Sequence, residues 1–268
     1  MSTTYAVLGG TGSTGSNIIR SLLKKPDGNK IQVYVRSAQK LANLVPAVTS
    51  DKRISIVEGS FNDSSVVIRV LQDADIIFAC IASNISEPGR TPAEDTAASI
   101  ISALQTLRST HSSYKPPTIV ILSSGSVNDY MTEQANNSYL ASKAKGFFYL
   151  CLYYCYTDLR RAEQIYASAS PELLHYISAS APGLMPGDSP TGHRLSFQTT
   201  GPICSFADLA EGMIEMSGRS EYWGKGVGVI ATGQVKQDWW PNIGYLFKGF
   251  TAYWLPWVWK LAKRWELW

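Results

Sequence analysis

The sequence predicts an α/β fold in which a parallel β-sheet is covered by helices on both faces, an arrangement called doubly wound. Residues 4–124 alternate short β-rich runs with helical patterns. The β-rich runs are largely apolar, as expected of strands that are buried on both faces of a parallel sheet. A glycine-rich turn joins the first run to the first helical pattern, and such turns are typical of this fold.

The predicted elements follow one another along the chain. The β-rich runs are TYAVLGG, IQVYVR, ISIVEGS, ADIIFACIAS and PTIVILSS, and the clearest helical patterns cover Ser13–Lys24 and Pro92–Leu107. KKPDGNK ends the first helix and SYKPPT precedes a strand over Thr118–Leu122, because proline and glycine interrupt regular structure. Beyond residue 182 the pattern becomes irregular, with a loop in APGLMPGDSPTGH and a helix in SFADLAEGMIEM.

The composition is that of a globular protein with a large core. The 268 residues are 45% hydrophobic and 17% charged, which argues against disorder. The net charge is +3 and the basic residues are scattered, so the chain lacks the basic stripe that nucleic-acid binding needs. The start, MSTTYAVLGG, has no charged segment followed by an apolar one, as a secretory signal has, which predicts a cytoplasmic protein.

The cysteines and histidines do not follow a metal-binding or disulfide pattern. The sequence has no CxxC motif, and its three histidines lie far apart in different contexts. Zinc sites and disulfide frameworks in small domains both depend on closely spaced, recurring ligands. We therefore expect no metal site, and we expect buried free thiols at Cys80, Cys151, Cys155 and Cys204.

A glycine-rich turn stands directly between the first predicted strand and the first predicted helix. In YAVLGGTGSTGSNIIRSLL, Gly9, Gly12 and Gly15 recur at three-residue spacing. Glycine permits the tight turn and lets backbone N–H groups and the helix N-terminus approach a pyrophosphate closely. The spacing predicts a dinucleotide phosphate site, which includes Ser13 and Thr14.

The residue after the second predicted strand indicates which dinucleotide binds. An enzyme that uses NAD carries an Asp or Glu there to hold the ribose hydroxyls. This chain has Arg36, which can bind a 2′-phosphate, and Lys40 lies one helical turn later. The pair predicts NADP(H). The alternative is a solvated arginine at the end of a strand.

The ends of the next two predicted strands complete the expected cofactor site. Ser60 and Phe61 follow the third strand, where the adenine is expected to lie. The segment ACIAS follows the fourth strand. We expect Ala79, Ile81 and Ala82 in this segment to pass beneath the cofactor.

Several motifs together resemble a known family. GGTGSTG, VRSAQKL, VEGSFND and SAPGLMPG resemble the NmrA-like atypical short-chain dehydrogenase/reductases. YTDLRRAEQ, SPTGHRLSF and the Trp/Pro-rich tail are similar, more narrowly, to the fungal averufin oxidase A-type oxidoreductases of aromatic polyketide pathways. The resemblance implies a Rossmann core over residues 1–180 that binds NADP(H), and a small substrate lobe with a Trp-rich tail packed on the core over residues 181–268.

The same resemblance implies an enzyme of secondary metabolism. We expect an NADPH-dependent oxidoreductase, a monomer or homodimer, that acts on an aromatic or polycyclic polyketide-like ketone or quinone. One alternative is a non-redox isomerase or cyclase that keeps bound NADP(H). Another is a regulatory protein that senses NADP and binds a protein partner, as some NmrA-like proteins do.

The short-chain family implies an active site made of a serine after the fifth strand and a Tyr-Lys pair on the next helix. VILSSGS offers Ser124 or Ser126 for the serine. Tyr139 and Lys143 in SYLASK are four residues apart, on one face of a helix, and Ser126 lies thirteen residues before Tyr139, the spacing of the simplest members. In this assignment Tyr139 is the proton donor and Lys143 also holds the nicotinamide ribose.

A second segment competes for the same role. YCYTDLRRAEQ is closer to the catalytic helix of the narrower family and places Tyr156 and Arg160 at the Tyr and Lys positions. Arginine is too basic to exchange its proton, but its charge still acts on the tyrosine. A third alternative is that no tyrosine donates a proton, and the sequence leaves all three open.

The C-terminal tail is unusually rich in tryptophan. Seven of the eight tryptophans follow Gln237, interleaved with Lys248, Lys260, Lys263 and Arg264. The longest uncharged run, Gly249–Trp259, contains a proline and is too short to cross a bilayer. The rings either lie on a membrane surface or pack over the core and line a pocket for a flat substrate. We expect the second arrangement, with most rings buried.

Overall fold

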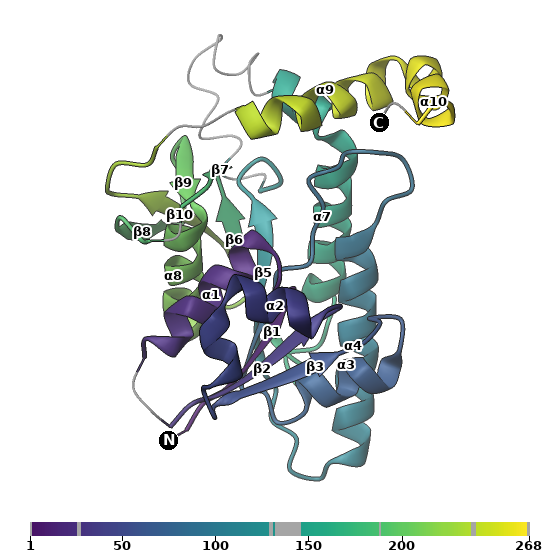
Figure 1. The fold of residues 1–268 in the computed structure, drawn as a ribbon. Helices are drawn as coiled ribbons and strands as arrows, with labels where there is room; N and C mark the ends of the chain where they lie inside the picture. Colours follow the sequence, from purple (N-terminus) through teal and green to yellow (C-terminus); the bar gives the residue numbers. More distant parts are fainter. Residues whose placement is uncertain are drawn as a thin grey trace.

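A mostly parallel sheet forms the centre of the molecule (Figure 1). The computed structural model describes residues 2–25, 28–128, 131, 146–187, 189–236 and 240–266. Within these residues eight strands lie in the order β3-β2-β1-β4-β5-β6-β10-β8, and only β8 runs antiparallel to its neighbour. The strands are β1 (Thr4–Leu8), β2 (Lys30–Val35), β3 (Ile54–Glu58), β4 (Ile76–Ala79), β5 (Thr118–Ser124), β6 (His175–Ala181), β8 (His193–Ser196) and β10 (Gly226–Ala231).

Helices cover both faces of this sheet, so the predicted doubly wound fold is confirmed. On one face lie α1 and α8, and on the other α3, α4 and α7. A small sheet of β7 and β9 lies beside the main one. The bounds are α1 (Ser13–Leu23), α2 (Ala38–Leu44), α3 (Ser64–Leu71), α4 (Pro92–Thr110), α7 (Tyr153–Ala167), α8 (Phe206–Ser217), α9 (Trp240–Trp254), α10 (Pro256–Arg264), β7 (Gly183–Met185) and β9 (Ile203–Ser205), with short 3-10 turns at Pro46–Thr49 and Ser220–Tyr222.

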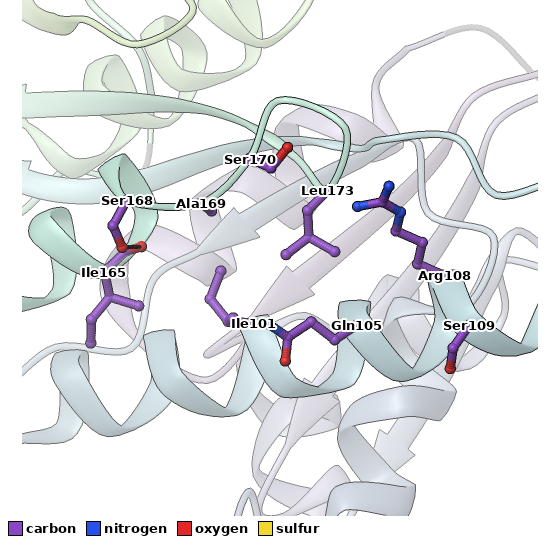
Figure 2. Close-up of a pocket in the computed structure, with 9 residues that line it drawn as sticks. All are labelled: Ile101, Gln105, Arg108, Ser109, Ile165, Ser168, Ala169, Ser170 and Leu173. Atoms are coloured by element: carbon purple, nitrogen blue, oxygen red, sulfur yellow. Dashed lines mark hydrogen bonds between the residues drawn. The ribbon is translucent and has the colours of Figure 1, made fainter.

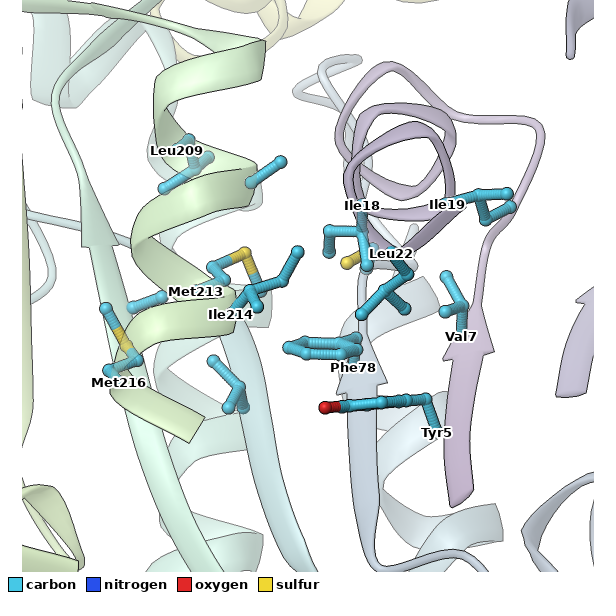
Figure 3. Packing of buried hydrophobic residues seen from close by; sticks show 14 of the residues in the cluster. Tyr5, Val7, Ile18, Ile19, Leu22, Phe78, Leu209, Met213, Ile214 and Met216 are labelled. Carbon is cyan, nitrogen blue, oxygen red and sulfur yellow. The ribbon is translucent and has the colours of Figure 1, made fainter. Parts of the chain in front are cut away.

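The strands are apolar because each side of the sheet has its own core. Val7 packs with α1 and α8, whereas Ala6 and Leu8 pack with α3, α4 and α7. Successive side chains of a strand point to opposite faces, so β1 contributes to both cores. Figure 3 shows the first core, where Leu22 of α1 and Ile214 of α8 face each other beside the sheet.

The second core leaves a groove at its edge. It has a volume of about 540 Å³ and lies between α4 and the end of α7 (Figure 2). Ile101 and Gln105 of α4 face Ser168 and Leu173 across it. Leu173 lies two residues before β6, so the groove is at the amino ends of the strands. Ligands of open α/β sheets bind at the opposite, carboxyl ends.

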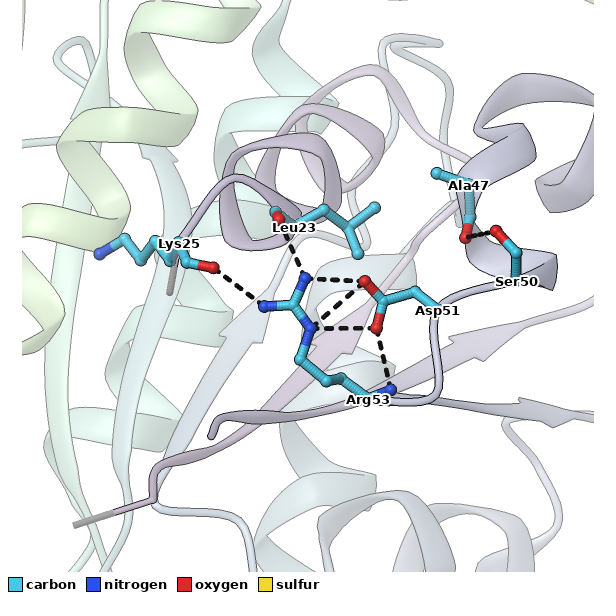
Figure 4. Close-up of polar contacts among 6 residues, drawn as sticks. All are labelled: Leu23, Lys25, Ala47, Ser50, Asp51 and Arg53. Carbon is cyan, nitrogen blue, oxygen red and sulfur yellow. Dashed lines mark hydrogen bonds and ion pairs between the residues drawn. The ribbon is translucent and has the colours of Figure 1, made fainter. Parts of the chain in front are cut away.

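Two charged side chains join neighbouring elements. Arg53 donates hydrogen bonds to the carbonyl oxygens of Leu23 and Lys25, both at 2.9 Å, and pairs with Asp51 at 2.7 Å (Figure 4). These bonds satisfy carbonyl groups that the end of α1 leaves without helical partners. The hydrogen bonds that the Arg53 side chain and backbone N–H donate to Asp51 hold the pKa of that carboxyl down, to about 2.

Asp158 of α7 joins two helices in a similar way. Its buried carboxylate accepts hydrogen bonds from the backbone N–H groups of Ala93, at 3.0 Å, and Glu94, at 2.8 Å. Both groups are in the first turn of α4, which has no partner for them within the helix. The carboxylate therefore caps α4 and fixes it to α7.

The region after residue 181 is divided between the sheet and the surface. Its strands β10 and β8 extend the central sheet, and α8 covers that sheet with α1. The small sheet and the helices α9 and α10 lie outside this layer. The division into a core over residues 1–180 and a substrate lobe over residues 181–268 stays a prediction.

Candidate active site

The glycine-rich turn follows β1 at the carboxyl edge of the sheet. Gly9 has a φ of 90°, in the left-handed region, and a Cβ there would lie 3.0 Å from the Cys80 carbonyl oxygen. A Cβ on Gly15 would lie 2.3 Å from the Gly9 carbonyl oxygen. Because these obstacles are backbone atoms, only glycine fits at either position. The turn is therefore held close to the chain that leaves β4.

The N-terminus of α1 is open beside this turn. Gly12 is its N-cap and supplies no side chain to the first helical turn. Gly12 and Ser13 are exposed, whereas Thr14 and Gly15 are buried. The first N–H groups of a helix have no intrahelical partner and carry partial positive charge. This terminus fits a dinucleotide pyrophosphate, because the glycines leave the backbone uncovered and the N–H groups are the donors that a phosphate needs.

Two cations and a carboxylate lie at the carboxyl ends of β2 and β3. Arg36, directly after β2, and Lys40, in the first turn of α2, are both exposed. Ser37 caps α2 by accepting a hydrogen bond from the Lys40 N–H at 3.2 Å. Glu58, the last residue of β3, accepts one from the Ala38 N–H at 3.1 Å. We did not predict Glu58 as a site residue from the sequence. Its position near the end of the strand-like run ISIVEGS could have indicated it.

The expected adenine residues lie after β3. The half-buried ring of Phe61 meets that of Tyr34 edge to face, with the ring centres 5.0 Å apart. The Ser60 hydroxyl accepts a hydrogen bond from the Asn62 N–H at 3.2 Å, which shapes the turn into α3. Phe61 is thus fixed against the end of β2, near the chain that carries Arg36.

The chain leaving β4 lies against the glycine-rich turn. A Cβ on Gly9 would be 3.2 Å from the side chain of Ile81, so these two residues are neighbours. Ala79 is buried at the end of β4, and Ala82 is exposed beyond Ile81. The carboxyl ends of β1 and β4 are therefore adjacent, and the predicted cofactor residues on them share one edge of the sheet.

A tyrosine and two serines meet at the end of β5. Ser124 is the last residue of β5, Ser126 is in the following turn, and Tyr156 is in the first turn of α7. The side chains of Ser126 and Ser124 both lie near the Tyr156 hydroxyl. Burial raises the pKa of Tyr156, and the two serines, as hydrogen-bonding groups, lower it in part. The structure thus brings Tyr156 to two serines that lie 30 and 32 positions before it in the sequence.

Arg160 lies one helical turn after Tyr156. Its guanidinium donates a hydrogen bond to the Val127 carbonyl oxygen at 3.3 Å, so it braces the turn that follows β5. The same turn is held on its other side by the Gly125 N–H, which donates to the Ala181 carbonyl oxygen at 2.8 Å. Tyr139 and Lys143 lie outside the described residues, and their assignment stays a prediction.

The chain was compared with known proteins. A family model described as NAD(P)H-binding matches residues 9–216, from the glycine-rich turn to the end of α8. The chain belongs to this NAD(P)H-binding family. The match covers the strands and turns that carry the predicted cofactor residues.

Relatives of this NAD(P)H-binding protein include fungal oxidoreductases. Averufin oxidase A of Aspergillus flavus is 38% identical over 93% of this chain and 90% of its own. Oxidoreductase ordB of Dothistroma septosporum is 33% identical over 96% and 93%. The resemblance to averufin oxidase A-type proteins is therefore confirmed, and the protein is an NAD(P)H-binding oxidoreductase.

A solved structure shares the fold of this oxidoreductase. It is a short-chain dehydrogenase/reductase from Veillonella parvula in complex with NADP, with a TM-score of 0.62. The match covers 86% of this chain and 95% of that one, at 16% sequence identity. At that identity the likeness concerns the fold, which is the Rossmann arrangement predicted from the sequence.

A row of aromatic rings leads from Tyr156 of this oxidoreductase to its tail. Tyr149 lies 5.4 Å from Tyr156 and 6.4 Å from Tyr153, measured between ring centres. Tyr153 then meets Tyr253 of α9 at 4.7 Å, and Tyr253 meets Trp254 at 5.7 Å. We did not predict this row, although the aromatic-rich run FFYLCLYYCY signals it.

The tail corrects one expectation. We expected most of its tryptophan rings to be buried, but Trp254, Trp257 and Trp265 are 52%, 68% and 69% exposed. The reason is that small residues of α9 pack on the chain just before α7. A Cβ on Gly249 would lie only 1.8 Å from the Cys151 carbonyl oxygen, which shows how closely the backbone of α9 approaches that chain. The large rings are left on the outer side.

The remaining sequence expectations concern cysteines, metals and the membrane. Cys80, Cys151, Cys155 and Cys204 are all free and buried, as expected. Burial raises the pKa of Cys80 and of Cys204 to about 12, so these thiols stay protonated. Over the described ranges, no cluster of three metal-ligating side chains occurs. Among the helices of the same ranges, none has the length and apolar character to cross a membrane.

Proposed function

We propose that this oxidoreductase uses NADPH to reduce a carbonyl group of an aromatic, polycyclic ketone or quinone. The observation that carries the proposal is the grouping of Tyr156 with Ser124 and Ser126. This group stands at the carboxyl end of β5, on the sheet edge that also bears the glycine-rich turn. The name of the relative averufin oxidase A supports a substrate of averufin's class.

The charges near the end of β2 support NADPH over NADH. Arg36, directly after β2, and Lys40, in the first turn of α2, are both exposed. A 2′-phosphate carries negative charge and accepts charge-assisted hydrogen bonds from both side chains. Glu58 is close by, but it accepts a hydrogen bond from the α2 N-terminus, whose dipole stabilises its charge.

Tyr156 is the proton donor in this proposal. Addition of hydride to a carbonyl carbon leaves negative charge on the oxygen, and a positioned acid neutralises it. Bound NADPH supplies the hydride. Since burial raises the pKa of Tyr156, its phenol keeps the proton at neutral pH until the oxygen becomes basic. Ser126 and Ser124 hold the phenol and offer hydroxyl donors where the charge develops.

Arg160 takes the place that a lysine has in the short-chain family. Its guanidinium stays charged throughout, so it contributes a fixed positive field and no proton. Its hydrogen bond to Val127 also keeps the serine turn in position. This departure from the family pattern favours, as a second candidate, a non-redox isomerase or cyclase that retains the dinucleotide.

The experiment follows NADPH absorbance with averufin and with menadione, a small aromatic quinone, as substrates. Tyr156→Phe is expected to lower the rate by roughly 10²–10⁴-fold, the usual contribution of a positioned general acid. NADPH binding, measured by fluorescence titration, is expected to stay within about twofold because the hydroxyl makes no phosphate contact. Tyr154→Phe is the matched control, since it removes a hydroxyl from the same helical turn.

Tyr139→Phe separates the two tyrosine assignments. If Tyr139→Phe abolishes turnover and Tyr156→Phe stays active, the proposed role of Tyr156 is wrong. Turnover of averufin without loss of NADPH absorbance would support the isomerase or cyclase instead. Tight NADPH binding without any turnover would support the third alternative, a regulatory NADP-sensing protein.

A further inference from the structure

The two C-terminal helices present an apolar surface that the proposed chemistry does not use. On α10, Trp257 is 68% exposed and Leu261 is 51% exposed, and Trp265 follows at the same four-residue spacing. Residues four apart lie on one face of a helix, so these side chains form a stripe. Trp254 and Leu255, between α9 and α10, are exposed as well. We call these five residues the tail stripe.

The stripe is outward-facing because the opposite sides of both helices are fixed to the body. On α9, Ala252 and Thr251 are buried, and Gly249 approaches the backbone of Cys151, two residues before α7. On α10, Ala262 is buried. Lys263 pairs with Glu87, in the chain after β4, at 2.7 Å. The orientation of the stripe therefore follows from packing of the rest of the helices.

Two cations border the stripe. Lys260 and Arg264 are exposed, and each directly precedes a stripe residue, Leu261 or Trp265. Across the described part of the chain, neither has an acidic partner. The sequence from Trp240 to Trp265 contains no Asp or Glu. Glu266, which follows Trp265, is exposed, so the surface combines large apolar rings with a net positive charge.

We infer that the tail stripe docks on the surface of a membrane that contains anionic lipid. Tryptophan rings favour the boundary between headgroups and acyl chains, and lysine and arginine next to them bind lipid phosphates while their stems remain in the apolar layer. A symmetric contact with a second copy of this chain would place Lys260 and Arg264 near the same cations of the other copy. Charge complementarity therefore selects lipid over self-association.

The docked surface is connected to the group around Tyr156. Trp254 belongs to the stripe, and through Tyr253, Tyr153 and Tyr149 it begins the row of rings that ends at Tyr156. A protein docked in this way would have the lipid surface next to α9, which contacts α7, the helix that carries Tyr156. The docking itself does not depend on the proposed reaction.

The test is flotation of the full chain with vesicles of phosphatidylcholine, with and without phosphatidylserine. The protein is expected to float with the anionic vesicles at low salt and to be released at high salt, because salt screens charge. Its tryptophan emission is expected to shift to shorter wavelength on binding. Lys260→Gln with Arg264→Gln is expected to weaken binding about 25-fold, from roughly a fivefold loss per cation.

Matched control variants identify the cause of any loss of vesicle binding. Lys30→Gln with Lys52→Gln removes the same charge at the amino ends of β2 and β3, where both side chains are exposed, and is expected to float normally. Trp257→Ser with Leu261→Ser is expected to abolish binding even at low salt. NADPH titration and thermal unfolding of each variant show that the fold is intact.

Three results would overturn the inference. The first is that the unmutated protein fails to float with either vesicle. The second is that the two charge pairs lose binding equally, which would show an effect of net charge and no role for the stripe. The third is a dimer in sedimentation analysis that Trp257→Ser dissociates, which would make the stripe a contact between copies of the chain.

Discussion

Replacement of Gly15 by alanine tests the packing of the phosphate turn. The new Cβ would lie 2.3 Å from the Gly9 carbonyl oxygen, 2.9 Å from the carbonyl carbon and 3.2 Å from the Gly10 Cα. The first distance is about 1 Å shorter than an ordinary van der Waals contact. All three atoms belong to the backbone, so no side chain can rotate to relieve the contact. The turn must open instead.

Opening the turn has two measurable costs. Overpacking of this kind destabilises a protein by about 1–3 kcal/mol, which lowers the melting temperature by roughly 2–10 °C for a chain of this size. Displaced N–H groups also lose their hydrogen bonds to the phosphates. Loss of two such bonds, at about 1.5–3 kcal/mol each, weakens NADPH binding by more than about 100-fold.

Thermal unfolding and NADPH titration of the same samples measure both effects. Gly218→Ala is the control, because its Cβ would meet no atom within 4 Å and its φ is −88°. It is expected to leave NADPH binding unchanged and to alter stability by less than about 0.5 kcal/mol. If Gly15→Ala binds NADPH within twofold of the unmutated protein, the turn does not hold the phosphates as we infer.

Three further predictions concern Arg36, Arg53 and Tyr156. Arg36→Ala is expected to weaken NADPH binding by about 1–3 kcal/mol and leave NADH binding unchanged; equal affinity of the unmutated protein for both cofactors would contradict the role of Arg36. Arg53→Ala removes bonds to the carbonyl groups of Leu23 and Lys25, so it should lower the free energy of unfolding by about 1.5–3 kcal/mol in denaturant titration, with NADPH binding retained. Since burial raises the pKa of Tyr156, its phenol stays protonated to higher pH, so the reduction rate should remain flat through neutral pH and fall only above about pH 10; a decline near pH 7 would exclude it as the acid.

The sequence predicted the first half of the fold well because the signals there are local. The helix expected over Ser13–Lys24 is observed over Ser13–Leu23, and the strand expected over Thr118–Leu122 extends to Ser124. Glycine spacing and proline position depend on backbone conformation a few residues away. Such features can be recognised without knowledge of distant contacts.

The candidate acid could not be chosen from the sequence for a physical reason. Tyr139 with Lys143 and Tyr156 with Arg160 have the same spacing, so each pair lies on one helical face. Tyr156 lies near Ser124, which precedes it by more than 30 residues in the sequence. Only the folded arrangement shows such a contact. Burial of the tail rings was mispredicted for a similar reason, since the close approach of Gly249 to Cys151 determines which side of α9 faces the body.

The cap that Asp158 places on α4 has a consequence for the energetics of binding. Asp158 is two residues after Tyr156, and its carboxylate is fixed by two N–H donors before any ligand arrives. The turn carrying Tyr156 therefore has little rotational freedom left to lose when a substrate binds. The conformational entropy of this turn is already lost during folding. Substrate binding therefore does not have to order the turn, and more of the binding free energy aligns the substrate. A residue that touches neither substrate nor dinucleotide in this way helps to set how tightly the protein holds its reactants.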